Sequence, residues 1–383
     1  MRRTIQAALV LLAACGGPAR SGPLVEEPRP SAVSSPAAEG GPTGASVEAA
    51  IVDDRIIELA RHGGETCARR ASGAVWCWGV MPSTADRARI EASLGARLSP
   101  PGPTRVAEGA VSVAVGWLVR ASGGVARWSY DLTATGGEDS ALTVEARAIV
   151  HDEPMPDGGS AWSAGAAGCV VTSLRTVRCF TGSRVPNPVA EPSGAGRWVE
   201  VVGLSGVSRV SARWDVACAL AGERVWCWGM APSTGLGRAA GPMVEPAELS
   251  TLGAATSVSV GEAQACAVLR DGGVACWGDV FPGEGDGTDR HHAAAPEPVA
   301  GLSDVVEFAP AAFHACARLG SGEVRCATER SPSPWVPLRG VRDARALVAD
   351  DRGGCVLSAR GALACWSWPA EGAAMAPVPV VLP

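Results

Sequence analysis

The chain has 383 residues, 47% of them hydrophobic, and a formal net charge of −6. It contains no lysine. A mildly acidic chain without a basic cluster argues against nucleic acid as a partner. The absence of lysine also excludes a catalytic lysine, a Schiff base and a Walker-A phosphate loop. With 48 glycines and 29 prolines, the composition indicates many short elements joined by turns.

The first fifteen residues have the layout of a signal peptide. Met1-Arg2-Arg3 is positive, and the apolar run Ile5–Ala14 is too short to span a bilayer. Leu12-Ala13-Ala14-Cys15 resembles the lipobox of bacterial lipoproteins. This resemblance implies that residues 1–14 are removed and that Cys15 carries the lipid. An ordinary signal peptide followed by an incidental cysteine is the alternative.

Residues 15–50 are rich in Gly, Pro, Ser and Ala and have almost no aliphatic periodicity. Such a stretch buries too little apolar surface to offset the entropy of ordering it. We predict a flexible tether that joins the lipid to a folded part at residues 51–383. No later apolar run is long enough to span a membrane, so the lipid is the predicted membrane contact. The predicted location is the bacterial cell envelope outside the cytoplasm, the outer membrane rather than the inner.

Twelve of the thirteen cysteines form six pairs, five of them ten residues apart and one nine. Zinc-binding pairs usually lie two to four residues apart, and so many matched cysteines are unusual in a reducing cytosol. We therefore predict six disulfides in an oxidising compartment. The predicted bridges are Cys67–Cys77, Cys169–Cys179, Cys218–Cys227, Cys266–Cys276, Cys316–Cys326 and Cys355–Cys365.

Each cysteine pair is predicted to bridge its own β-hairpin. Ten-residue spacing leaves three residues for each strand arm and three for a loop such as Ala71-Ser72-Gly73, whose last position favours glycine. The shorter pair leaves a two-residue loop that starts with Gly222, which indicates a type II′ turn. Ser173-Leu174-Arg175 lacks glycine, so we expect a strained or different turn there. The cysteines fall at non-hydrogen-bonded positions, where Cα atoms about 4.5 Å apart can be bridged.

Seven copies of this hairpin occur, and the copy without cysteines has Trp117 and Arg127 in their places. Copies begin about 50 residues apart, a period typical of four-stranded β-propeller blades. We predict an all-β, seven-bladed β-propeller with one intra-hairpin disulfide in six of the blades. Residues 377–382 are predicted to form a strand that completes the first blade, which would close the ring and protect a sheet edge.

The segment from Cys266 to Gly278, followed by Gly285-Asp286-Gly287-Thr288, resembles the repeat of the regulator of chromosome condensation family. Gly235-Leu236-Gly237 is similar to another element of that repeat. The resemblance covers roughly residues 50–383 and is weaker where Phe180 and Ala327 replace the tryptophan after the second cysteine. It implies a seven-bladed propeller that binds other molecules through its loops. Guanine-nucleotide exchange, known in the eukaryotic founder, needs a cytoplasmic partner that an exported chain does not meet.

Tryptophans and histidines supply the first candidate sites. Five tryptophans recur at one repeat position, which favours packing between blades over ligand binding or ultraviolet absorption. They are Trp78, Trp128, Trp228, Trp277 and Trp366. His291-His292 lies near Asp286 and Asp289, but adjacent side chains in an extended segment point apart, so we predict no metal and no other cofactor. His314 is expected to be a structural hydrogen-bonding residue.

The acidic pairs Asp53-Asp54, Asp152-Glu153 and Asp350-Asp351 fall in different parts of the chain. A glycosidase needs two carboxylates that face each other across a cleft. Gly-x-Ser-x-Gly is absent, and the predicted bridges together with lipidation of Cys15 leave no thiol nucleophile, so no catalytic residue is predicted. We expect a monomeric, non-enzymatic scaffold for another protein or a cell-surface polymer. A polysaccharide or peptidoglycan hydrolase is the alternative, and acidic residues clustered at the mouth of the ring would favour it.

Overall fold

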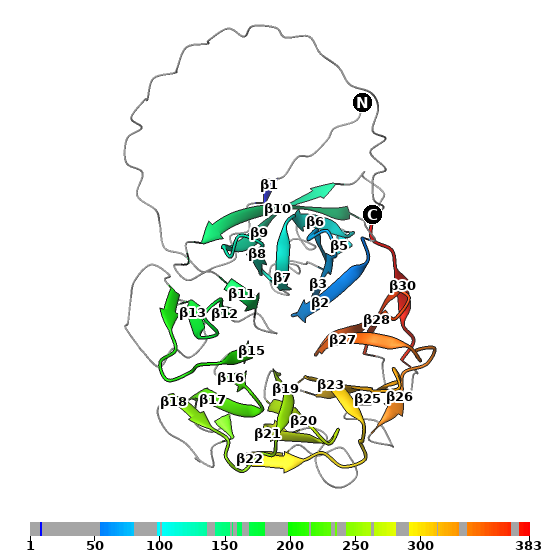
Figure 1. The fold of residues 1–383 in the computed structure, drawn as a ribbon. Coiled ribbons are helices and arrows are strands. Elements are labelled where there is room, and N and C mark those ends of the chain that lie inside the picture. Colours follow the sequence, from blue (N-terminus) through cyan, green and yellow to red (C-terminus); the bar gives the residue numbers. More distant parts are fainter. Residues whose placement is uncertain are drawn as a thin grey trace, which may run out of the picture.

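Seven sheets surround a common axis in the computed structural model, so the predicted all-β, seven-bladed propeller is confirmed (Figure 1). Each blade is built on four antiparallel strands, and two short strands add to the sheet of blade two, one of them in parallel. The structure describes residues 8–9, 54–79, 98–99, 102–135, 142–153, 155, 159–162, 168–180, 198–213, 216–230, 234–235, 243–261, 264–280, 291–311, 313–328, 335–368 and 375–383.

The blades are numbered in chain order, and each is given with its innermost strand first. Blade one contains β2 (Ile56–His62), β3 (Glu65–Arg70), β4 (Val75–Trp78) and β6 (Thr104–Ala107). Blade two contains β7 (Ala110–Ala114), β8 (Trp117–Arg120), β9 (Val125–Thr135) and β10 (Leu142–Glu153), and β1 (Ala8–Leu9) and β5 (Leu98–Ser99) pair with its two outer strands. Blade three contains β11 (Gly159–Trp162), β12 (Cys169–Thr172), β13 (Val177–Phe180) and β14 (Trp198–Glu200).

The remaining blades repeat the same order. Blade four contains β15 (Val207–Arg213), β16 (Val216–Ala221), β17 (Arg224–Met230) and β18 (Met243–Glu248). Blade five contains β19 (Ala255–Val260), β20 (Gln264–Leu269), β21 (Val274–Val280) and β22 (His291–Pro298). Blade six contains β23 (Val305–Pro310), β24 (His314–Leu319), β25 (Val324–Thr328) and β26 (Val336–Pro337). Blade seven contains β27 (Ala344–Asp350), β28 (Gly353–Ser358), β29 (Leu363–Ser367) and β30 (Val378–Val380).

All six predicted disulfides are present, each between directly opposed residues of the second and third strands of a blade. Their Cα atoms lie 4.0–4.1 Å apart, as expected for non-hydrogen-bonded pairs. In blade two, Trp117 and Arg127 oppose each other at the same place. The cysteine spacing therefore predicted the hairpin register correctly. Cys15 lies outside the described residues.

The hairpin turns follow the predicted chemistry. Gly73, at the third loop position, has a φ of 85°, and Gly222 in the two-residue loop has a φ of 63°. In the loop without glycine, Arg175 takes the left-handed conformation itself, with a φ of 62°. A side chain is disfavoured in that conformation, so the predicted strain is present at Arg175.

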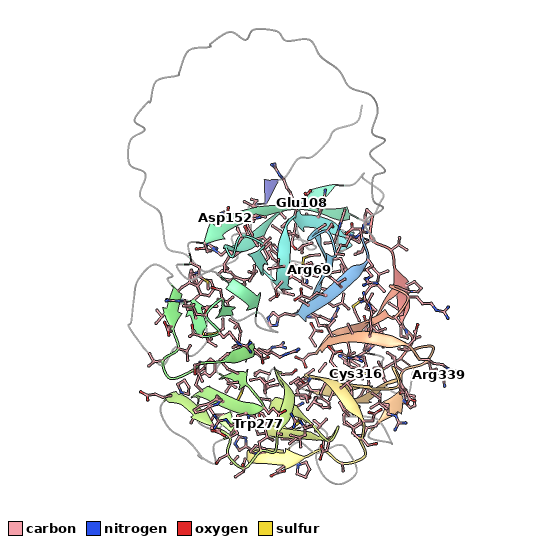
Figure 2. All side chains as sticks on the ribbon, viewed as in Figure 1. Arg69, Glu108, Asp152, Trp277, Cys316 and Arg339 are labelled. Atoms are coloured by element: carbon pink, nitrogen blue, oxygen red, sulfur yellow. A yellow bond between two sulfur atoms is a disulfide. The ribbon has the colours of Figure 1, made fainter. Side chains whose placement is uncertain are left out.

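The recurring tryptophans pack between blades, as predicted. Trp277 of blade five is fully buried in one cluster with Cys218 and Cys227 of blade four (Figure 2). A Cβ added to Gly235 would lie 2.6 Å from the Trp277 ring, which explains the glycine there. The same contact between a tryptophan and the disulfide of the preceding blade recurs for Trp78 with Cys355–Cys365, Trp128 with Cys67–Cys77, Trp228 with Cys169–Cys179 and Trp366 with Cys316–Cys326.

At two interfaces, other side chains fill the space between neighbouring blades. Between blades two and three, Trp117 packs edge-on against Phe180 and Trp198, with ring centroids 5.3 and 5.6 Å away. Between blades five and six, where Ala327 replaces the tryptophan, Phe308 and Trp335 complete the cluster. Larger side chains elsewhere thus compensate for the missing cysteines or tryptophan.

The prediction that residues 377–382 complete the first blade is wrong. β30 pairs with β29 inside blade seven, whereas blade one obtains its fourth strand from β6. The last two residues still reach blade one, because the Arg70 guanidinium donates to the carbonyl oxygens of Leu382 and Pro383 at 3.3 and 2.8 Å. Packing between complete blades therefore closes the ring, without exchange of a strand.

Candidate functional site

The innermost strands of the blades surround a central channel of about 550 Å³. Its lining comes mainly from β2, β7, β15, β19, β23 and β27. Each of these strands has a register irregularity after its first residue, which turns the third residue toward the channel. The third residues are Glu58, Ser112, Arg209, Ser257, Glu307 and Ala346.

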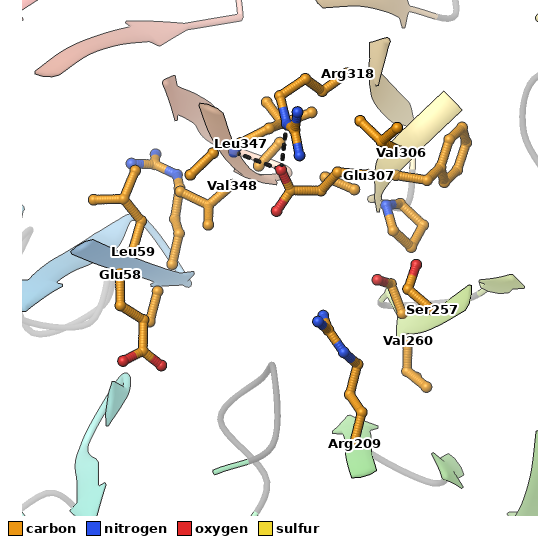
Figure 3. A pocket seen from close by; sticks show the side chains of 18 of the residues that line it. Glu58, Leu59, Arg209, Ser257, Val260, Val306, Glu307, Arg318, Leu347 and Val348 are labelled. Atoms are coloured by element: carbon orange, nitrogen blue, oxygen red, sulfur yellow. Dashed lines mark hydrogen bonds and ion pairs between the residues drawn. The ribbon is translucent and has the colours of Figure 1, made fainter. Parts of the chain in front are cut away.

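Two glutamates at this position join neighbouring blades. Glu58 accepts hydrogen bonds from Arg69 of its own blade at 2.6 Å and from the backbone N–H of Val113 in blade two at 3.3 Å. Glu307 accepts from Arg318 at 2.8 Å and from the backbone N–H of Leu347 in blade seven at 3.0 Å (Figure 3). Burial raises the pKa of Glu307, while the hydrogen bond from Arg318 lowers it. Both carboxylates therefore have a structural role.

Arg209 occupies the equivalent place in blade four with the opposite charge. The residue opposite it on β16 is Leu220, whereas an arginine lies opposite each glutamate. Within the described residues Arg209 forms no ion pair, and its exposed guanidinium extends toward the Glu307 side of the channel (Figure 3). Among the described residues, therefore, no carboxylate is in direct contact with the Arg209 guanidinium.

Hydroxyl groups lie beside Arg209 on the strands of blades four and five. Ser208 and Thr256 donate to backbone carbonyl oxygens of their own blades, at 3.2 Å each. Ser257 and Ser259 also line the channel, and in the described part of the chain their hydroxyls make no hydrogen bond. The lining also includes two apolar side chains, Ile57 of blade one and Val306 of blade six, which are 37% and 43% exposed.

Charged residues gather where β2 and β27 end, at the other end of the channel. Arg61 donates to Asp350 at 3.0 Å, and both side chains are nearly buried, at 8% and 1% exposure. Burial and the charge of Arg213 lower the pKa of His62 to about 4. Folded His62 is therefore neutral at pH 7.

The predicted histidine sites are placed differently from each other. His292 lies opposite Asp279 on the neighbouring strand, with Nδ1 and Oδ1 2.9 Å apart and both side chains exposed. Asp286 and Asp289 lie outside the described residues. His314 stacks on Trp368 with ring centroids 4.2 Å apart, and within the described residues its Nδ1 has no hydrogen-bond partner. Stacking is therefore an observed contact of this side chain, and the expected structural hydrogen bond is not found at Nδ1.

The described members of the three predicted acidic pairs are dispersed. Asp152 lies on the outer strand of blade two, where it pairs with Arg120, far from the channel in Figure 2. Asp54 pairs with Arg70 before β2, and the Ser72 hydrogen bonds lower its pKa. Asp350 is at the channel end. Among the described members of these pairs, none faces another across the channel.

A further set of ligand-type atoms consists of Glu65, Cys67 and Cys77, which lie within 4.8 Å of one another. The two sulfurs are bonded to each other, so they are not thiolates that bind metal. Tyr130 donates to Glu65 at 2.6 Å, and burial raises the pKa of Glu65 to about 7. This group therefore forms a buried contact between blades one and two.

Sequence analysis missed the channel residues. In an alignment of the copies on their first cysteines, Glu58, Arg209 and Glu307 fall in one column, nine residues before Cys67, Cys218 and Cys316. The charge reversal in that column was the available signal.

No protein-family model matches the sequence, and a search of curated proteins found no match. Among solved structures, human WBSCR16 has a TM-score of 0.54 and 17% identity, over 74% of this chain and 86% of that chain. At this identity the likeness concerns the fold alone. Prp20p from Saccharomyces cerevisiae has a TM-score of 0.44 and 14% identity, over 85% of this chain and 77% of that chain. PorZ of Porphyromonas gingivalis has a TM-score of 0.45 and 12% identity, over 86% of this chain and 39% of that chain.

Proposed function

We propose that the protein is a lipid-anchored, extracytoplasmic propeller that binds another protein or a cell-surface polymer and performs no catalysis. Six disulfides support an oxidising compartment. The lipobox-like sequence before Cys15 supports the anchor. No described helix is long and apolar enough to cross a membrane.

The binding role is supported by the contacts of the channel carboxylates, which are structural. Glu58 and Glu307 each accept from an arginine and from a backbone N–H of the next blade. A general acid or nucleophile would need a carboxylate released from such contacts and a second one facing it. A stapled ring with structural carboxylates suits recognition better than hydrolysis.

The two faces of the ring differ in a way that favours one of them for binding. Connections between the second and third strands are tight turns, whereas those between the third and fourth strands include residues 181–197 and 231–242. In an antiparallel blade these two kinds of connection start from opposite faces. Long connections on a rigid scaffold are the usual place for recognition, so we place the partner on the second face.

Site-specific photo-crosslinking in intact cells tests this assignment. A photoreactive residue at Phe313, 40% exposed next to β24 on the proposed face, is expected to capture a defined partner. The matched control is Leu174, 70% exposed in a tight turn on the opposite face, which is expected to capture none. Capture from Leu174 alone would contradict the assignment, and turnover of a glycan or peptide by the purified protein would contradict the non-enzymatic role.

The anchor is tested separately. Mass spectrometry of the intact mature protein is expected to find a lipid on Cys15 and no free thiol. Cys15→Ser is expected to move the protein from the membrane to the soluble fraction. Recovery of an unmodified Cys15 would contradict the anchor without affecting the binding role.

A further inference from the structure

The channel contains an ionic arrangement that is repeated twice and then broken once. In blades one and six, the third residue of the innermost strand is a glutamate opposite an arginine, Arg69 or Arg318. In blade four this residue is Arg209, and Leu220 lies opposite it. The blade that reverses the charge therefore supplies no neutralising partner on its second strand.

The surroundings of Arg209 leave its charge available to a ligand. Glu307, toward which it extends, already pairs with Arg318 at 2.8 Å, so these two charges offset each other (Figure 3). Glu58 is likewise offset by Arg69 at 2.6 Å. A cation inside a concave site attracts anions more strongly than the same cation on an open surface, because the surrounding protein focuses its field.

Donors for a second contact lie on the neighbouring strand. Ser257 and Ser259 are two residues apart on β19, so both side chains are on its channel side. Their hydroxyls have no hydrogen bond within the described residues, in contrast to Ser208 and Thr256. A guanidinium with adjacent hydroxyl donors matches the two oxygens of a carboxylate.

Apolar side chains in the lining offer contacts for an organic body. Ile57 of blade one and Val306 of blade six expose 37% and 43% of their surface. The volume of about 550 Å³ is within the usual range of small-molecule sites, about 300–1,000 Å³.

We propose that the central channel binds a small organic carboxylate. The carboxylate contacts the Arg209 guanidinium and the hydroxyls of Ser257 and Ser259, and the apolar body lies against Ile57 and Val306. This site is distinct from the loop face proposed for a macromolecular partner, so either proposal can fail while the other stands.

Saturation-transfer NMR on the purified full-length protein tests the site with three probes of equal apolar body. Phenylacetate is expected to bind, whereas 2-phenylethanol and 2-phenylethylammonium are expected to bind at least about tenfold more weakly, since a head-group charge contact accounts for that much. Inorganic phosphate is expected to compete only weakly, because it lacks the apolar body.

Two variants locate the binding. Arg209→Glu gives this position the residue type of blades one and six with the opposite charge, and it is expected to weaken phenylacetate binding at least tenfold. The joint change Ser257→Ala and Ser259→Ala is expected to weaken it severalfold. The control Arg360→Met alters an exposed turn arginine outside the channel and is expected to leave binding unchanged.

Several outcomes would overturn the proposal. They are equal binding of phenylacetate to wild type and Arg209→Glu, equal binding of the three probes, and binding of phosphate without phenylacetate. Circular dichroism of Arg209→Glu is expected to match wild type. If that variant is unfolded, the serine double variant decides the test, and unchanged binding to it contradicts the site.

Discussion

Two equivalent interfaces of the ring are built differently: the one between blades two and three, and the one between blades four and five. In the latter, Trp277 packs on the Cys218–Cys227 bridge. In the former, Trp117 stands at the cysteine position and packs on Phe180. The comparison separates two contributions that coincide elsewhere: the covalent bond constrains its hairpin, and the large apolar side chain fills the gap between blades.

Removal of the tryptophan gives the largest expected effect. Trp277→Ala leaves a cavity beside the disulfide, since the side chain is fully buried. The expected loss in free energy of unfolding is about 3–5 kcal/mol. Chemical denaturation measures it, and the control Trp76→Ala, at a half-buried position beside Arg70, is expected to cost less. Equal losses would mean that the inter-blade site has no special role.

Removal of one bridge is expected to cost less. The double change Cys218→Ala and Cys227→Ala loses the constraint on a short hairpin, about 2–3 kcal/mol in the chain-entropy model. Combined with Trp277→Ala, the losses are expected to be non-additive because the groups touch. Strict additivity in the double-mutant cycle would contradict the proposed packing between them.

Introduction of a bridge into blade two tests whether the two interfaces are interchangeable. Trp117→Cys with Arg127→Cys is expected to form a disulfide, since these residues are directly opposed. The lost aromatic packing is expected to outweigh the bridge, with a net loss of about 2 kcal/mol. Adding Phe180→Trp restores the usual pattern and is expected to recover part of the loss. No recovery would show that Trp198 fixes this interface in its present form.

The contact between blades one and two gives a pH-dependent prediction. Burial raises the pKa of Glu65 from 4.5 to about 7, so the folded state binds more protons than the unfolded state between these values. The stability contributed by the protonated carboxyl is full below pH 4.5 and is lost as the pH rises through 7. Glu65→Gln keeps the acceptor for Tyr130 and is expected to raise stability at pH 8 by about 2 kcal/mol.

Thermal unfolding of both proteins from pH 4 to pH 8 measures this difference. The matched control is Glu108→Gln, which alters an exposed ion pair with Arg105 and is expected to change stability little. A constant difference between Glu65→Gln and wild type at every pH would contradict the linkage.

The turn of blade three gives the smallest expected effect. Arg175→Gly removes a side chain from a left-handed residue and is expected to stabilise by about 1 kcal/mol. The reverse change Gly361→Arg, at a left-handed glycine with open space around it, is expected to destabilise by a similar amount. A loss of stability in Arg175→Gly would mean that the arginine side chain makes a contact worth more than the strain.

Much of each blade could be predicted from the sequence because its determinants are local. The spacing of Cys67 and Cys77, together with the glycine at position 73, defines a turn, a register and a bridge within ten residues. The absence of both cysteines in blade two likewise identified Trp117 and Arg127 as an opposed pair. Backbone conformation and cross-strand pairing over so short a span depend little on the rest of the molecule.

The assignment of β30 and the channel residues depended on the tertiary structure. A terminal strand with alternating prolines can add to either of two sheet edges. Because β6 already covers the edge of blade one, β30 pairs with β29 in blade seven. Arg209 and Glu307 are almost one hundred residues apart, and only the closed ring brings both to one channel. The sequence by itself determined the blades, because turns and bridges are local, whereas the position of the blades around the axis decided which side chains meet.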